Sequence, residues 1–143
     1  MFSLSNSSLK TLEDTLEKSI EQQPTHISTY ALSIEPRTPF HKQNKKPLSN
    51  DKELSQYKVI CRALKKAGYN QYEVSAFSKP GYECQHNLSY WKYNDFIGLG
   101  PSAASFFKEY HYTNPRNLYQ YQQNPLPKLF RKTPWPKTTK TIQ

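Results

Sequence analysis

The spacing of hydrophobic residues in the first part of the chain predicts a helix followed by a strand. Apolar residues recur at helical intervals from Leu9 to Ile20, and Ser8 just before them is a suitable N-cap. We expect this helix to end before Pro24. Residues 27–34 are rich in β-branched and aromatic side chains and are followed by a Glu-Pro pair, which predicts a strand.

A second helix and a second strand are predicted further along. Asn50 and Glu53 form an approximate capping box, apolar residues between 54 and 64 share one helical face, and Gly68 is a suitable stop. Residues 69–74 then read as a strand. A strand, a helix and a strand at this spacing predict a right-handed crossover within a parallel sheet. These few strands cannot close a barrel by themselves.

Composition favours a fragment over a self-sufficient enzyme. The 143 residues amount to about one domain, yet only 35% of them are hydrophobic and the mean hydropathy is -0.91. No apolar run approaches the roughly 20 residues that a membrane span requires. The spacing of the two cysteines does not match a disulfide framework, which agrees with a reducing compartment. We therefore expect a cytoplasmic protein. The alternating helices and strands predicted above place it in the α/β class.

The net charge of +9 is concentrated near the end of the chain. No acidic residue follows Glu109, whereas six lysines and arginines do. Residues 124–143 combine prolines, lysines and threonines without helical or strand periodicity, which predicts a disordered basic tail. Such a tail has affinity for RNA or anionic lipid, or it is an incidental terminus. We favour the second reading and expect no specific nucleic-acid partner.

The segment 86–91, His-Asn-Leu-Ser-Tyr-Trp, carries the most distinctive chemistry of the chain. It places an imidazole, an amide, a phenol and an indole close to the turn that Gly98 and Gly100 open. This composition is typical of a ligand site, and the glycines would let a bound group approach the backbone. The alternative is an aromatic cluster that lines a core and contains a satisfied histidine.

Four segments in a fixed order resemble the later half of the oxygen-independent coproporphyrinogen oxidase-like proteins, which are radical S-adenosylmethionine proteins. Each segment alone is a weak signal, but the four together are specific. The last part of the third segment, residues 86–91, resembles in particular the branch of haem chaperones. The resemblance implies that residues 1–123 form the later part of a radical-SAM-type (β/α) barrel. The four segments are residues 26–38, 67–75, 79–91 and 98–103.

Two motifs of that family are missing from this sequence. Family members carry a Cys-x-x-x-Cys-x-x-Cys run that holds a [4Fe-4S] cluster, and a Gly-Gly-Thr-Pro segment that helps to seat S-adenosylmethionine. This chain has only Cys61 and Cys84, whereas such a cluster takes three or four thiolates. Cys61 lies on the apolar face of the second helix, which predicts a core position. We therefore expect neither cofactor in this chain alone.

The resemblance also implies site residues. His86 is the candidate for haem or porphyrin contact, either as an axial ligand of the iron or as a donor to a propionate. Asn87 would orient His86, while Tyr90 and Trp91 would lie along the macrocycle. Ser33 and Ala104 occupy positions where the true oxidases contact S-adenosylmethionine.

Other polar residues have weaker interpretations. Glu35 ends the first strand, where barrel chemistry usually sits, and a capping or salt-bridging role is an equal alternative. His26 is interpreted as structural, whereas His41 and His111 receive no role.

Three functions remain open on this evidence. The first is haem or porphyrin binding without radical chemistry. The second is a subunit of a split coproporphyrinogen dehydrogenase, whose cluster-bearing half comes from a separate chain. The third is a remnant without function.

Overall fold

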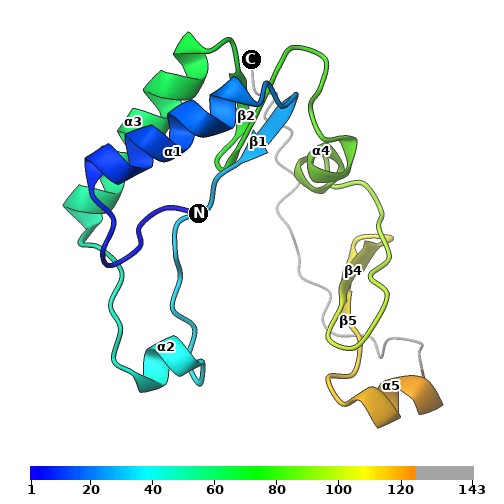
Figure 1. Ribbon diagram of the computed structural model, residues 1–143. Helices are drawn as coiled ribbons and strands as arrows, with labels where there is room; N and C mark the ends of the chain where they lie inside the picture. The colour runs from blue at the N-terminus through cyan, green and yellow to red at the C-terminus, as the bar shows by residue number, and fades with distance from the viewer. Residues whose placement is uncertain (125–143) are drawn as a thin grey trace. The chain divides into compact units, whose positions relative to one another are not determined.

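The computed structural model describes residues 1–124 of the chain. These residues form two compact units that divide between Cys84 and Gln85, and each unit is considered by itself. The expected disordered tail lies, from residue 125 onward, outside the described residues. The first unit contains α1 (Leu9–Glu21), β1 (His26–Ser28), α2 (Pro39–Lys42), α3 (Asn50–Lys66), β2 (Asn70–Glu73) and β3 (Ala76–Ser78); the second contains α4 (Gln85–Trp91), β4 (Ala104–Phe107), β5 (Tyr110–Thr113) and α5 (Leu118–Gln123) (Figure 1).

The first helix forms as the sequence predicts. The Ser8 Oγ accepts a hydrogen bond of 3.1 Å from the Thr11 backbone N–H, and the Thr11 Oγ1 accepts one of 3.0 Å from the Ser8 N–H. These reciprocal bonds satisfy donors that the first helical turn leaves without intrahelical partners. Helix α1 ends at Glu21, before Pro24, and buries Leu12 and Leu16.

The start of α3 differs from the prediction. Its N-cap is Ser49, whose side chain makes no capping hydrogen bond, so the capping box expected on Asn50 and Glu53 is wrong. Glu53 instead accepts a hydrogen bond of 2.6 Å from the Ser3 hydroxyl and ties α3 to the beginning of the chain. The C-terminal end agrees with the prediction, because Gly68 follows the helix with a φ of +83° that favours glycine.

The sheet of the first unit has a different topology from the expected one. β1 and β2 do not pair with each other, since β3 lies between them and is antiparallel to both. The predicted crossover between adjacent parallel strands is therefore wrong for the described residues, although β1 and β2 do run in the same direction. The physical reason is that the chain turns back directly after Glu73 and inserts Ala76–Ser78 as an antiparallel strand.

The predicted strand over residues 27–34 is shorter than expected. Regular pairing covers only β1, and beyond it the chain makes a single parallel pairing between Ala31 and Phe2. The Phe2 N–H donates to the Tyr30 carbonyl, and the Phe2 carbonyl accepts from the Leu32 N–H, both at 2.9 Å. Residues near the beginning of the chain thus pair with the segment that follows β1.

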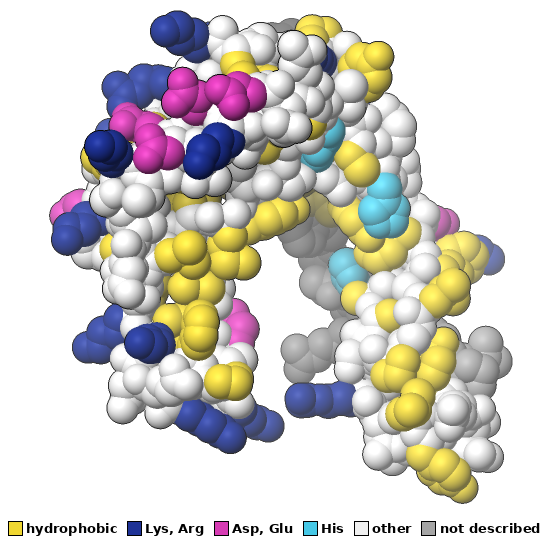
Figure 2. Space-filling view, viewed as in Figure 1, with side chains coloured by type: hydrophobic (Ala, Val, Ile, Leu, Met, Phe, Trp, Pro, Cys, Tyr) yellow, Lys and Arg dark blue, Asp and Glu magenta, His cyan; other side chains and the backbone are white. Residues whose placement is uncertain are grey.

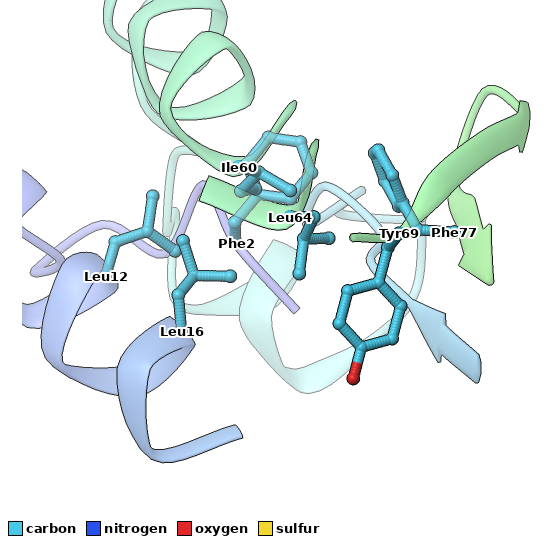
Figure 3. Close-up of a cluster of buried hydrophobic side chains, with 7 residues drawn as sticks. All are labelled: Phe2, Leu12, Leu16, Ile60, Leu64, Tyr69 and Phe77. Carbon is cyan, nitrogen blue, oxygen red and sulfur yellow. The ribbon is translucent and has the colours of Figure 1, made fainter. Parts of the chain in front are cut away.

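Helices α1 and α3 pack on one side of this sheet and form the core with it (Figure 3). The phenolic ring of Tyr69 belongs to the core, and its hydroxyl donates a hydrogen bond of 2.6 Å to the Pro24 carbonyl. Cys61 is half-buried and packs against this core without belonging to it, which differs from the core position predicted from the sequence. The core side chains are Phe2, Leu12, Leu16, Ile60, Leu64, Tyr69 and Phe77.

The second unit is built around an antiparallel hairpin of β4 and β5. The turn between these strands consists of Lys108 and Glu109, whose φ angles are 49° and 67°. Both residues adopt the left-handed conformation that a type I′ turn requires and that usually selects Asn or Gly. The Asp95 Oδ1 accepts a hydrogen bond of 3.0 Å from the Lys108 N–H and supports the turn. The mixed α/β fold predicted from the sequence is confirmed.

Candidate functional site

The segment 86–91 lies on a short helix that the sequence analysis did not predict. Helix α4 carries all four residues singled out in this segment. Because residues four apart are neighbours on a helix, His86 and Tyr90 form one row and Asn87 and Trp91 form the next. The structure therefore brings the four side chains to adjacent rows of one helix. The seven-residue length of α4 explains why its periodicity was hard to recognise.

His86 and Tyr90 form a hydrogen-bonded pair. The Tyr90 hydroxyl lies 2.7 Å from the His86 Nε2. The two ring centroids are 4.8 Å apart at an interplanar angle of 76°, which is an edge-to-face contact. The Ser89 hydroxyl donates a hydrogen bond of 2.6 Å to the His86 carbonyl and stabilises the first turn of α4. The hydrogen bond and the ring contact thus hold the two side chains in a defined arrangement.

An extended row of aromatic rings begins at this pair. The Tyr90 ring meets the Phe96 ring edge to face, with centroids 4.6 Å apart and an angle of 89°. Phe96 pairs with Phe106 of β4 through two backbone hydrogen bonds, and the Phe106 ring lies 4.9 Å from the His111 ring. Rings at these distances are within favourable contact range. The Tyr90 ring is therefore in contact with both the His86 ring and the Phe96 ring.

The interpretation of Gly98 as space for a bound group is wrong. A Cβ built on Gly98 would clash with the Ala104 carbonyl oxygen and lie 3.0 Å from the Ala103 Cβ, so the chain itself occupies this space. The Gly98 N–H donates to the Ser105 hydroxyl at 2.9 Å, and its carbonyl accepts from the Asn114 side-chain N–H at 3.0 Å. Glycine is required here for a close approach between backbone segments.

The Asn114 side chain stabilises the loop that contains Gly98 and Gly100. Its Nδ2 also donates to the Gly100 carbonyl at 2.9 Å, while Gly100 donates its N–H to the Tyr121 hydroxyl at 2.9 Å. The buried Asn114 Oδ1 has no hydrogen-bond partner within residues 1–124. These hydrogen bonds stabilise the loop that leads into β4. Ala104, the first residue of β4, is exposed.

The aromatic groups of α4 remain accessible. Tyr90 is 41% exposed and Trp91 is 58% exposed. Hydrophobic side chains gather on the visible face of the unit that carries β4 and β5, whereas charged side chains gather over α1 and α3 (Figure 2). An apolar, aromatic surface next to polar ring atoms is suited to a flat ligand with a polar centre.

Ser33 lies in the first unit, in a separate setting. Its hydroxyl donates a hydrogen bond of 2.7 Å to Glu35 Oε1, and both residues line a cavity of about 250 Å³ with Thr38 and Phe40. The Glu35 backbone carbonyl also accepts from the Thr38 hydroxyl at 2.7 Å. Glu35 thus makes local contacts before α2, but the N-cap of that helix is Thr38. A larger groove between α1 and α3 contains none of the predicted site residues.

The remaining histidines and the cysteines show no metal centre. His26 is bonded to the Tyr72 hydroxyl at 2.7 Å, which favours its structural interpretation. His41 lies in α2 and His111 in β5. Within residues 1–124, no group of three or more His, Cys, Asp or Glu side chains is arranged to hold a metal ion.

The comparison with known proteins bears directly on the segment resemblance. No family model matches the sequence. The chain is 43% identical over 106 residues to "Heme chaperone HemW" of Buchnera aphidicola from Schizaphis graminum, and 42% identical over 103 residues to the protein of the same name from Escherichia coli. Each match covers 72% of this chain. The chain belongs to the oxygen-independent coproporphyrinogen oxidase-like family. The resemblance recognised from the four segments is confirmed.

A solved structure shows the same fold. It is the structure of coproporphyrinogen III oxidase (HemN) from Escherichia coli, which is described as a radical SAM enzyme. The match has a TM-score of 0.68 and covers 85% of this chain at 19% identity. That alignment covers 32% of the enzyme, and this chain spans 27% of the length of the two chaperones. None of the helices in residues 1–124 is both long and apolar enough to cross a membrane.

Proposed function

We propose that this chain binds haem or a related porphyrin at α4 and performs no radical chemistry of its own. The relatives named as heme chaperones support the ligand class. The observation that carries the proposal is the hydrogen-bonded His86–Tyr90 pair, which lies on an accessible helix surface beside the exposed Trp91. A cytoplasmic location is part of the same proposal.

The residues of α4 suit the parts of a haem. The macrocycle is a flat apolar surface, and the exposed indole of Trp91 offers a matching face. The iron at its centre takes nitrogen or oxygen ligands, which the His86–Tyr90 pair presents in the neighbouring row. Lys92, exposed directly after the helix, offers a cationic partner for a propionate. The side chains present therefore fit a haem as cargo.

A second candidate is a subunit of a split radical enzyme. The observation that favours it is the cysteine content, because two cysteines cannot supply the three or four thiolates of a [4Fe-4S] cluster. A separate chain would then contribute the cluster and the S-adenosylmethionine site, to which Ser33 and Ala104 would add contacts. Co-purification of such a chain with this one would favour the split enzyme over the haem-binding segment. If this chain binds neither haem nor a cluster-bearing chain, the remnant hypothesis remains.

The test is a haem titration followed at the Soret band. Wild type should show saturable binding, and His86→Ala should bind at least about tenfold more weakly, the loss typical of removing a group at a metal site. His111→Ala is the matched control, since His111 also contacts an aromatic ring but lies on β5. Circular dichroism checks that each variant is folded. Equal affinity in all three proteins would eliminate His86 from the site, and absence of saturable binding in folded wild type would overturn the proposed function.

A further inference from the structure

We infer that the groove between α1 and α3 is a docking site for an amphipathic helix of a partner protein, with lysines or arginines along the flank of that helix that faces α1. The groove, of about 880 Å³, lies within the first unit, and none of its lining residues belongs to α4. The inference is independent of the haem binding proposed above. The observations that carry it are the shape of the groove floor and a row of carboxylates along one wall.

The floor of the groove consists of two short rows of apolar side chains. Leu16 and Ile20 are four residues apart on α1, and Ala63 and Ala67 are four residues apart at the end of α3, so each pair lies along one side of its helix. The two helices lie side by side (Figure 1). The alanine methyl groups fill little of the space between them, which leaves a hollow for the side chains of a third helix.

Three carboxylates follow one wall of the groove at intervals of four residues, namely Glu13, Glu17 and Glu21. Like charges at this spacing on a helix repel each other. Glu21 is also the last residue of α1, where the helix dipole disfavours a negative charge. Within residues 1–124, none of the three carboxylates is paired with a lysine or an arginine. Cations on a partner would therefore relieve a repulsion that α1 carries alone.

The opposite wall carries positive charge and restricts the partner further. Lys66 lies in the last turn of α3, and the Lys79 ammonium group lies 5.9 Å from the centroid of the Tyr69 ring. A contact between a cation and an aromatic ring at this distance is favourable. A partner helix with cations on both flanks would place some of them against these lysines. The charges thus favour a helix whose cationic flank faces α1 and whose other flank is neutral or acidic.

The test measures the fluorescence anisotropy of a labelled helical peptide titrated with the full chain. The probe has about 18 residues, or roughly 27 Å of helix, and carries a leucine stripe with lysines along one flank and glutamines along the other. Wild type should bind it saturably and more weakly as the salt concentration rises, because salt screens exposed charges. A peptide of the same composition in scrambled order, without the stripe, should bind at least about tenfold more weakly.

Variants of the chain separate docking in the groove from general attraction to α1. The double variant Glu13→Gln, Glu17→Gln should bind the probe about threefold to tenfold more weakly. Ala63→Phe, which fills the floor, should weaken binding at least about tenfold. Asp14→Asn is the matched control and should bind as wild type does, since Asp14 is an exposed carboxylate on α1 that does not line the groove. Circular dichroism checks that each variant is folded.

Several results would overturn the inference. These are the absence of saturable binding by folded wild type, equal affinity for the ordered and scrambled peptides, and unchanged affinity in the folded groove variants. An equal loss of affinity in Asp14→Asn and in the double glutamate variant would show general attraction to α1 instead of docking. A wild-type dimer in sedimentation velocity that Ala63→Phe abolishes would assign the groove to a second copy of the chain, which also contradicts the proposed partner.

Discussion

Replacement of Gly98 by alanine tests whether close backbone contact, rather than ligand space, explains this glycine. The new Cβ would meet the Ala104 carbonyl oxygen and carbon and the Ala103 Cβ. Two of these three atoms belong to the backbone of β4, which cannot rotate away as a flexible side chain would. The expected result is that the segment 96–98 separates from β4, because the two stretches cannot both keep their positions.

The magnitude follows from the contacts that are lost. Overpacking costs about 1–3 kcal/mol. Gly98 also donates to the Ser105 hydroxyl and accepts from the Asn114 side chain, and each hydrogen bond contributes about 1 kcal/mol. Gly98→Ala should therefore reduce the free energy of unfolding by about 3–5 kcal/mol. For a unit of this size, that corresponds to a fall in Tm of roughly 10 °C or more.

The assay is thermal unfolding combined with hydrogen exchange of individual amides. Faster exchange is expected for amides of β4 and β5, whereas amides of α3 should exchange as in wild type. Gly81→Ala is the control: its Cβ would have nothing within 4 Å, and only its φ of +83° adds strain, about 1–2 kcal/mol. A Gly98→Ala protein as stable as wild type would refute the reasoning, because the Ala104 carbonyl would then have moved away without a cost in stability.

Three further predictions concern the helix cap, the hairpin turn and the cysteines. Ser8→Ala should destabilise the chain by about 1 kcal/mol in urea unfolding, whereas Ser49→Ala, at a cap without a side-chain hydrogen bond, should stay close to wild type; equal effects would contradict the capping argument. Replacement of Lys108 and Glu109 by Asn and Gly should raise stability by about 1 kcal/mol or more, because both positions have positive φ; a lower unfolding midpoint would contradict this account. Anaerobic reconstitution should yield no stoichiometric [4Fe-4S] cluster, as iron and sulfide analysis would show, and a full cluster would refute the cysteine argument.

The elements predicted correctly are those with long periodic patterns. Helix α1 has both a capping serine and repeated apolar positions, and α3 has a long apolar face with Gly68 at its end. Strand β3 was missed because Ala76–Ser78 is only three residues long and its turn contains Val74 and Ser75 instead of Asn or Gly. Without β3, the two remaining strands looked like a parallel pair.

The candidate site was recognised from residue types, but its geometry was not. The sequence indicated that His86 and Tyr90 belong to one site, yet their direct hydrogen bond depends on α4, which is too short for a clear hydrophobic period. The hairpin beside it was missed for a physical reason as well. Lys108 and Glu109 occupy left-handed positions that sequence patterns normally assign to Asn and Gly.

Line broadening by ferric haem in the amide NMR spectrum of the isotope-labelled chain tests the central claim most directly. Because ferric haem is paramagnetic, it broadens resonances close to its binding site. The account predicts that broadening at substoichiometric haem is strongest for the α4 amides and the Trp91 indole N–H. Uniform broadening, or broadening centred on α1 and α3, would contradict haem binding at α4.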